Sequence, residues 1–334
     1  MALKAAILGT GAMGKKHASS LLKLGITVSA VCNHNRIKAE EFKKDLELHD
    51  AAVYDDFTAM IENSDFDVLF ICIPPYAHTG QFELAAGRGK HIFIEKPIAI
   101  RTSIGARMVN SAKKNKIITM TGFHMRKGAA VKRLAELVKR GAAGKPVLCN
   151  TLFQCNITDK PWWINNDLCG GQILEQAIHI YDLCRLFLGE PKSAQALMAN
   201  ICHSHLPGYT IEDASACLAG FWNGAMASIS ANNCAVPGNG VLKLTAVFEK
   251  ITADFTDHNH GVIVFTSGPQ TRTEKIDGDT DAHFEMVREF IECVDGRRET
   301  SCDILEGYRS LCFVETAVRS AGLDGAKLAV DQAL

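Results

Sequence analysis

Three side chains able to exchange protons or accept hydrogen bonds follow a pair of glycines near the middle of the chain. Glu175, His179 and Asp182 come after Gly170-Gly171 in an otherwise apolar run. At about 100° per residue, an α-helix places these three positions within an arc of roughly 60°. Their apolar neighbours indicate a buried helix, on which a titratable row needs partners or a catalytic role. A solvated stripe on an amphipathic helix is the alternative that spacing alone leaves open.

A second candidate site is a glycine-rich turn near the start of the chain. The apolar run 3–8 leads into Gly9-Thr10-Gly11-Ala12-Met13-Gly14, and a helical pattern follows. G-x-G-x-x-G between a strand and a helix is typical of sites that bind the pyrophosphate of a dinucleotide, because free amides at the helix start favour the anion. We therefore expect cofactor contacts from Gly9, Gly11, Ala12, Met13 and Gly14.

The residues after the next strand, 27–32, bear on the choice of cofactor. A site for NAD usually has an acidic residue there, which accepts hydrogen bonds from the ribose. This chain has Asn33 instead, with His34 and Arg36 close by. These residues would tolerate the 2′-phosphate of NADP, although Arg36 could equally begin the next helix in solvent. We expect all three to contact the cofactor, NAD or NADP, with the choice open.

Lys96 is the third candidate, because it follows an apolar strand pattern at 91–94 and precedes Pro97. Strands and helices alternate up to residue 121, which predicts a doubly wound parallel sheet whose ligands bind at the carboxyl ends of the strands. A lysine at that edge would face the nicotinamide and could polarise a carbonyl or stabilise an alkoxide. A surface lysine in a turn is the alternative. The further residues expected on the cofactor from this edge are Ile73, Pro74, His78 and Glu95, together with Lys96 itself.

The pattern changes after residue 122. Strand-like runs predominate between 146 and 266, and many alternate apolar and polar residues, as strands with one covered face do. The helix after Gly171 interrupts them, and two helical patterns at 282–295 and 303–321 close the chain. We therefore expect a Rossmann domain at 1–122 and, at 123–334, an α+β domain with an open, mainly antiparallel sheet.

Composition narrows the class of protein. The chain has 334 residues and a net charge of −1, which argues against a nucleic-acid partner. No apolar run approaches the ~20 residues of a membrane span. The twelve cysteines show no CxxC spacing, and the start of the chain has no signal-peptide layout. The histidine pairs His203/His205 and His258/His260 have no cysteine or carboxylate set beside them that would complete a metal site. We expect a cytoplasmic protein with reduced thiols, no metal, no membrane and no nucleic acid.

Three motifs together resemble those of a known family. They are Gly9-x-Gly11-x-x-Gly14-x-x-His17, Glu95-Lys96-Pro97 and Gly170-Gly171-x3-Glu175-x3-His179-x2-Asp182. In this order and at these separations they resemble the glucose–fructose oxidoreductase / inositol dehydrogenase / rhizopine-catabolism (Gfo/Idh/MocA) family, over essentially the whole chain. The resemblance implies an NAD(P)-dependent enzyme that oxidises or reduces a hydroxyl or keto group on a sugar, cyclitol or related polyol. It also implies that the domain 123–334 serves substrate binding and oligomerisation, with a homodimer or homotetramer formed through the C-terminal sheet.

The resemblance further implies site roles. Lys96 and His179 occupy the catalytic positions, with Glu175 in the place of a usual aspartate. His179 would take a proton from the substrate hydroxyl while Lys96 stabilises the alkoxide, and one residue from each domain implies a site in the interdomain cleft. The role of Asp182 stays open. The residues expected on the substrate are Lys96, Arg126, Trp162, Trp163, Glu175 and His179, although a tryptophan pair is as often core or interface packing.

Two other functions share these motifs. One is an enzyme with a tightly bound cofactor, which uses transient oxidation to drive elimination, epimerisation or glycosidic cleavage. The other is a non-catalytic dinucleotide sensor, for which loss of Lys96 or His179 would have been the sign; both are present.

Overall fold

The computed structural model describes residues 3–268 and 270–334, which form two compact units. The first unit extends to Phe123 and includes His283–Tyr308, and the second contains His124–Ala282 and Arg309–Ala333. The units therefore differ from a simple division after residue 122, since His283–Tyr308 packs with the first unit. Among the described residues, no helix combines the length and apolar character needed to span a bilayer.

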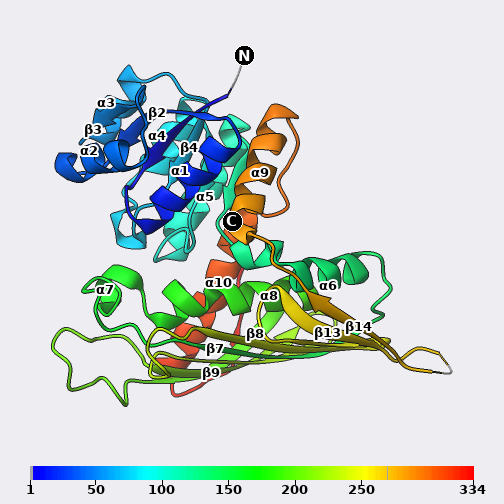
Figure 1. The fold of residues 1–334 in the computed structure, drawn as a ribbon. Helices are drawn as coiled ribbons and strands as arrows, with labels where there is room; N and C mark the ends of the chain where they lie inside the picture. The colour runs from blue at the N-terminus through cyan, green and yellow to red at the C-terminus, as the bar shows by residue number, and fades with distance from the viewer. Residues whose placement is uncertain (1–2, 269) are drawn as a thin grey trace. The chain divides into compact units, whose positions relative to one another are not determined.

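A six-stranded parallel sheet with the order β3-β2-β1-β4-β5-β6 forms the centre of the first unit (Figure 1). The strands are β1 Lys4–Leu8, β2 Thr27–Cys32, β3 Ala52–Tyr54, β4 Val68–Ile71, β5 His91–Ile94 and β6 Thr119–Thr121. β1 pairs in parallel with both β2 and β4, so the strand order reverses beside β1. This is the doubly wound order of dinucleotide-binding folds, and it confirms the expected fold.

Helices cover this sheet. They are α1 Ala12–Lys23, α2 Arg36–Asp45, α3 Phe57–Asn63, η1 Pro75–Ala77, α4 Gln81–Gly87, α5 Thr102–Asn115 and α9 Ala282–Asp295. Phe290 of α9 packs edge-on against Phe70 and Phe93, with ring centroids 5.7 and 5.8 Å apart. Because α9 buries its apolar side against this core, it belongs with the first unit, although it lies far along the chain.

The second unit contains a nine-stranded sheet with the order β14-β13-β12-β11-β7-β10-β9-β8-β15. The strands are β7 Pro146–Gln154, β8 Pro191–Ala199, β9 Ala214–Phe221, β10 Met226–Asn232, β11 Val241–Phe248, β12 Ile251–Phe255, β13 His260–Phe265, β14 Arg272–Asp277 and β15 Leu328–Ala329. β7 and β10 pair in parallel, and the other neighbours are antiparallel, so the expected mainly antiparallel sheet is confirmed.

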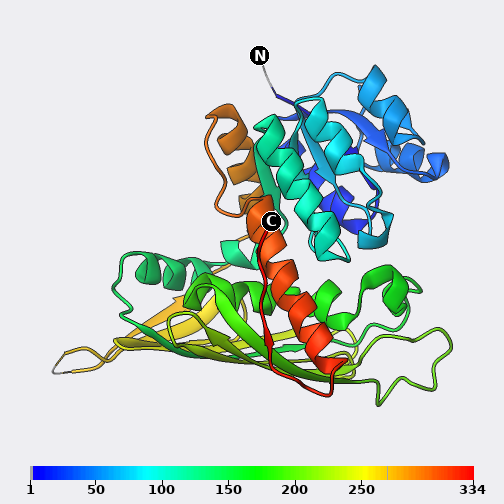
Figure 2. The same ribbon diagram turned by 180° about the vertical axis from the view of Figure 1, so that it is seen from behind.

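Helices lie on one face of the nine-stranded sheet and leave the other face bare (Figures 1 and 2). The helical segments of this unit are η2 His124–Lys127, α6 Ala129–Lys139, α7 Asn166–Cys169, η3 Ile173–Ala177 and α8 Ile178–Leu188, and α10 Ile304–Ala321 enters it from Arg309 onward. Tyr181 of α8 and Phe313 of α10 pack edge to face, with ring centroids 4.9 Å apart. The open sheet implied by the resemblance is therefore present.

Candidate active site

The glycine turn between β1 and α1 has the shape that a pyrophosphate needs. Gly9 has φ +100°, and a Cβ there would lie 2.5 Å from the carbonyl oxygen of Cys72. A Cβ on Gly14 would lie 2.1 Å from the oxygen of Gly9, whereas none of the described residues, apart from its two chain neighbours, has an atom within 4 Å of the Cβ position of Gly11. Within residues 3–268 and 270–334, no side chain caps the start of α1, so its first amides are available to an anion. The turn therefore fits a dinucleotide.

Asn33 joins the end of β2 to the glycine turn. Its Nδ2 donates to Thr10 Oγ1 at 2.7 Å, and its Oδ1 accepts from the amide of Asn35 at 2.9 Å. Asn35 caps α2, and Arg36 is the first residue of that helix. His34 and Arg36 are exposed, and Arg36 lies 3.5 Å from Glu40 in an ion pair. The end of β2 thus presents amides and cations, and their contact with a cofactor stays a prediction.

His78 lies after β4, beyond the short helix η1, at the same edge of the sheet as the glycine turn. Its side chain is buried, and burial lowers the pKa of the imidazole to about 4, opposed in part by a hydrogen bond to the backbone of Ile73. The ring is therefore neutral at neutral pH. Ile73, Pro74 and His78 lie at the carboxyl end of β4, and their contact with a cofactor stays a prediction as well.

Glu95 follows β5 and fixes the backbone from which Lys96 extends. Its Oε1 lies 2.6 Å from His17 Nε2, and its Oε2 accepts from the amide of Lys96 at 3.2 Å. Burial alone would raise the pKa of this carboxyl, but the hydrogen bond and charge of His17, with the charges of Lys96 and His283, hold it below its ordinary value. Glu95 is thus an ionised, buried anchor beside Lys96, whose own side chain is partly buried.

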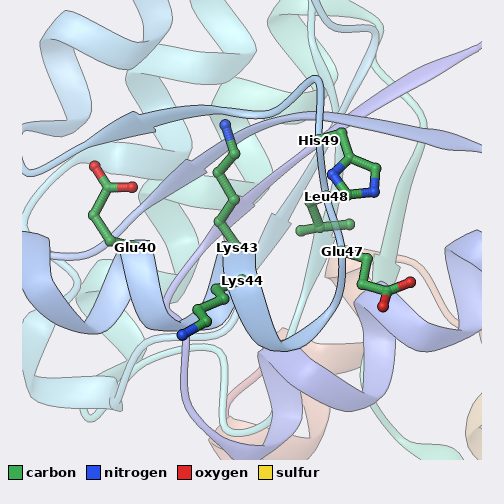
Figure 3. A pocket seen from close by; sticks show the side chains of 6 residues that line it. All are labelled: Glu40, Lys43, Lys44, Glu47, Leu48 and His49. Carbon is green, nitrogen blue, oxygen red and sulfur yellow. The ribbon is translucent and has the colours of Figure 1, made fainter.

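A surface depression of about 260 Å³ lies elsewhere in the first unit (Figure 3). It is lined by Glu40, Lys43, Lys44, Glu47, Leu48 and His49. These residues belong to the carboxyl end of α2 and the turn after it. None of the residues that line it belongs to the glycine turn Gly9–Gly14. It is not a candidate for the dinucleotide site.

In the second unit, Glu175 and His179 lie on a helix that changes its winding between them. Residues Ile173–Ala177 form a π-helix, η3, and residues Ile178–Leu188 continue as the α-helix α8. The expected regular spacing is therefore wrong for Glu175, because a π turn holds more residues than an α turn. Both side chains are buried, each 5% exposed. The alternative of a solvated stripe is thereby excluded, and π turns are frequent at functional sites.

His179 also has an aromatic neighbour that sequence reasoning missed. The ring of His124, from η2, packs edge to face against His179 with centroids 4.6 Å apart. The His124 ring also lies edge to face against the ring of His258, with centroids 5.7 Å apart. The carbonyl of His258 accepts hydrogen bonds from the amides of Ala130 and Val131 at 3.1 and 3.3 Å, so the start of α6 is fixed to the residue that contacts His124. No local pattern marks His124, which comes near His179 only through folding.

Asp182 has a structural partner in Arg126. Arg126 Nε donates to Asp182 Oδ2 at 2.7 Å, and its Nη2 donates to Oδ1 at 2.6 Å. Ser310 adds a hydrogen bond to Oδ1 at 2.8 Å and accepts one from Arg185 Nη1 at 2.8 Å. The Arg126 and Asp182 side chains are 6% and 1% exposed. Two donors of Arg126 are thus committed to α8, and a contact between this arginine and substrate stays a prediction.

The tryptophan pair precedes this helix. Trp162 and Trp163 pack edge to face at 5.6 Å, and Trp162 contacts the small apolar cluster of Cys169, Tyr209 and Ile211. Trp163 faces a cation, since Lys160 Nζ lies 4.1 Å from its ring centroid. These contacts show a packing role for the pair. Their expected contact with substrate is untested.

Glu212 is a further residue that sequence reasoning missed. Its Oε1 accepts the amide of Ile173, at the start of η3, at 2.7 Å. Burial raises the pKa of this carboxyl to about 7, opposed by the amides of Ile173 and Gln172 and reinforced by the charge of Asp213. Glu212 lies in a polar loop before β9 with no motif around it, so the sequence carries no local signal for its position.

Solved structures of several dehydrogenases have this fold. Levoglucosan dehydrogenase in complex with NADH is 19% identical over 100% of both chains, with a TM-score of 0.90. The WlbA dehydrogenase of Bordetella pertussis, in complex with NADH and UDP-GlcNAcA, is 21% identical over 99% of both chains, with a TM-score of 0.85. At such identities the likeness shows the fold.

Similar sequences include dehydrogenases of cyclitols. The myo-inositol 2-dehydrogenase of Thermotoga maritima is 28% identical over 56% of this chain and 55% of its own. Inositol 2-dehydrogenase/D-chiro-inositol 3-dehydrogenase of Lacticaseibacillus casei is 32% identical over 44% and 43%. The chain thus spans about half the length of these two relatives. The uncharacterized oxidoreductase YrbE of Bacillus subtilis is 23% identical over 94% and 93%.

Two models of one family match the two parts of the chain. The model described as an oxidoreductase family with an NAD-binding Rossmann fold matches residues 3–123, and the GFO/IDH/MocA C-terminal domain matches residues 131–268. Together they cover most of the chain, and both the glycine turn and the Glu175–His179 helix fall within the matched ranges. The chain belongs to the Gfo/Idh/MocA family of NAD-binding oxidoreductases.

Proposed function

We propose that this oxidoreductase transfers a hydride between NAD(P) and a hydroxyl or keto carbon of a sugar, cyclitol or related polyol. The observation that carries the proposal is the pairing of a turn shaped for a dinucleotide with buried Glu175 and His179 in the matched C-terminal domain. The names of the relatives, which include inositol dehydrogenases and a levoglucosan dehydrogenase, support polyhydroxylated substrates.

In this proposal the chain's own residues move a proton and stabilise charge. His179 takes the proton from the substrate hydroxyl during oxidation, and the Lys96 ammonium stabilises the developing alkoxide. Glu175 orients the imidazole or holds a neighbouring hydroxyl. The residues Gly9–Gly14 hold the pyrophosphate of the dinucleotide, which supplies the hydride acceptor when bound. Arg126, Trp162 and Trp163 stay as proposed substrate contacts.

The test is a panel of sugars, cyclitols and their keto forms, assayed with both cofactors at the NAD(P)H absorbance band. We expect Lys96→Ala and His179→Ala each to lower kcat at least a hundredfold, because a general base or an alkoxide-stabilising charge is lost. Dinucleotide binding, followed by NADH fluorescence, should persist. The matched controls Lys44→Ala and His49→Ala change exposed residues that line the surface depression, outside the proposed site, and should keep wild-type kcat. Wild-type turnover in either site variant would contradict the proposal.

The same assay separates this function from transient oxidation. An enzyme of that kind would purify with nicotinamide bound and would convert substrate without net change at the NAD(P)H band. A non-catalytic sensor would bind dinucleotide and convert nothing on the panel.

We also propose a homodimer or homotetramer formed through the bare face of the nine-stranded sheet, and a cytoplasmic location. The location is supported by the twelve cysteines, all of which are present as thiols. Fractionation of the cells that produce the protein tests the location.

A further inference from the structure

Glu212 contacts the amino end of the helix that carries Glu175 and His179. Its Oε1 accepts the amide of Ile173 at 2.7 Å, and the amide of Gln172 also favours its charge. The first amides of a helix have no partner within the helix, and a carboxylate placed there is stabilised by those amides and by the helix dipole. The hydrogen bond therefore ties the start of this helix to the loop before β9.

Gly171 connects Glu212 with Glu175. Gly171 has φ +100°, and a Cβ on it would lie 2.7 Å from Glu212 Oε2, so the carboxylate rests directly against this glycine. The carbonyl oxygen of Gly171 accepts the amide of Glu175 at 3.0 Å. A displacement of the Glu212 carboxylate would therefore shift the residue to which Glu175 is bonded.

The loop that carries Glu212 is itself fixed. Thr210 Oγ1 accepts the amide of Asn166 at 2.9 Å. Asp213 accepts three consecutive amides, from residues 201–203, at distances between 2.6 and 3.1 Å. Because Thr210 and Asp213, one on each side of Glu212 in the sequence, are tied to other segments, the carboxylate acts from a rigid support.

We propose that Glu212 is a positioning residue for the reaction: its carboxylate holds the amino end of the helix 173–188 and so places Glu175 and His179. This inference rests on the proposed function. The Arg126–Asp182 pair holds the same helix beyond His179, so the reactive residues lie between two anchors.

A neutral amide oxygen could also accept the hydrogen bond from Ile173. Because this chain has a carboxylate there, the strength of the hydrogen bond depends on whether Glu212 is protonated. The pKa of Glu212 is raised to about 7, by burial first and also by the charge of Asp213. The other titratable groups that it faces are Cys169 of α7, Tyr181 of α8 and Tyr209 of its own loop. The ionised form attracts the helix amides more strongly, and so positioning should improve as pH rises through neutrality.

The experiment compares Glu212→Gln and Glu212→Ala with wild type between pH 5.5 and 9, on the best substrate of the panel. The glutamine variant mimics the protonated side chain, so its kcat should match wild type below pH 6 and fall at least threefold short above pH 8. The alanine variant should lose at least tenfold in kcat at pH 8, with the KM for dinucleotide within twofold of wild type. Glu249→Gln and Glu249→Ala are the matched controls, because Glu249 Oε2 likewise accepts an amide, that of Lys145, beside a glycine.

Amide hydrogen exchange gives a readout that needs no substrate. At pH 8, a peptide covering 171–177 should exchange at least tenfold faster in Glu212→Ala than in wild type, with Glu212→Gln intermediate and the Glu249 variants unchanged. If no polyol is converted by wild type, the proposed function fails while exchange still tests Glu212. A pH profile of Glu212→Gln that superimposes on wild type, or unchanged exchange in both Glu212 variants, would overturn the inference.

Discussion

The ionisation of Glu212 has a consequence for stability as well as for turnover. Its pKa is raised from the ordinary value of 4.5 to about 7 in the folded chain. A carboxyl whose pKa is higher in the folded chain than in the unfolded chain stabilises the folded chain at pH values below the unfolded-state pKa. That stability is lost as the pH rises through the folded-state pKa. Between about pH 4.5 and 7, wild type should therefore lose stability relative to Glu212→Gln, by an amount on the order of 3 kcal/mol. Urea denaturation of both proteins at several pH values measures this difference, and a constant difference across that window would contradict it.

The end of β2 should decide between the two dinucleotides. Asn33 carries no charge, and exposed Arg36 stands at the start of α2. Asn33→Asp would repel a 2′-phosphate and accept from ribose hydroxyls, and Arg36→Ala would remove a cation. We expect each change to lower the ratio of kcat/KM with NADP to kcat/KM with NAD at least tenfold relative to the ratio of wild type. Lys38→Ala, an exposed cation on the same helix, is the control, and an unchanged ratio in both variants would exclude this role.

Among the elements, the helix 173–188 is the one on which the site depends most. The buried ion pair of Arg126 and Asp182 anchors the middle of this helix. Asp182→Asn would leave the Arg126 guanidinium buried without its carboxylate, which typically costs about 3–5 kcal/mol. Ser310→Ala removes one neutral donor to Asp182 and should cost about 1 kcal/mol. Urea denaturation measures both. Equal and small losses would show that the pair does not anchor the helix.

The same helix shows what sequence reasoning reaches. Its apolar residues predict a buried helix with Glu175 and His179 on it, and that is found. The π turn could not be predicted, because no local pattern marks it, and the carboxylate of Glu212 that accepts the amide of Ile173 comes from a loop about 40 residues later. The strand β14 was missed for another reason. Its sequence, Arg-Thr-Glu-Lys-Ile-Asp, is mostly polar, and only its pairing with β13 at the edge of the sheet makes it a strand.

Over the whole molecule, local patterns of apolar residues sufficed to predict the strands that have one or both faces covered. β4 is apolar throughout and β5 is apolar after His91, because helices cover the sheet on both sides, and the strand–helix alternation predicts the Rossmann order. The place of α9 could not be predicted in this way. An amphipathic helix indicates that it covers an apolar surface but not which one, and Phe290 joins a core built mainly from residues about 200 positions earlier.

The bare face of the nine-stranded sheet should hold the chain's assembly together. Leu197, Leu218 and Met226 are 64%, 62% and 58% exposed there, while the alternate residues of their strands face the helices. The register places Leu218 opposite Ser228 and Gln195 in the adjacent strands, so the leucine lies well inside the sheet. An exposed apolar surface of this kind usually marks an interface.

Leu218→Lys should therefore dissociate the assembly, because a lysine would place an unpaired charge inside the interface. Sedimentation velocity at micromolar concentration should show an oligomer for wild type and a monomer for this variant. Leu323→Lys changes another exposed leucine, 56% exposed after α10, and should keep the wild-type mass. A monomeric wild type, or an oligomer that survives Leu218→Lys, would mean that the sheet is bare for another reason. Retained dehydrogenase activity in a monomeric Leu218→Lys variant would show that each chain holds a complete site.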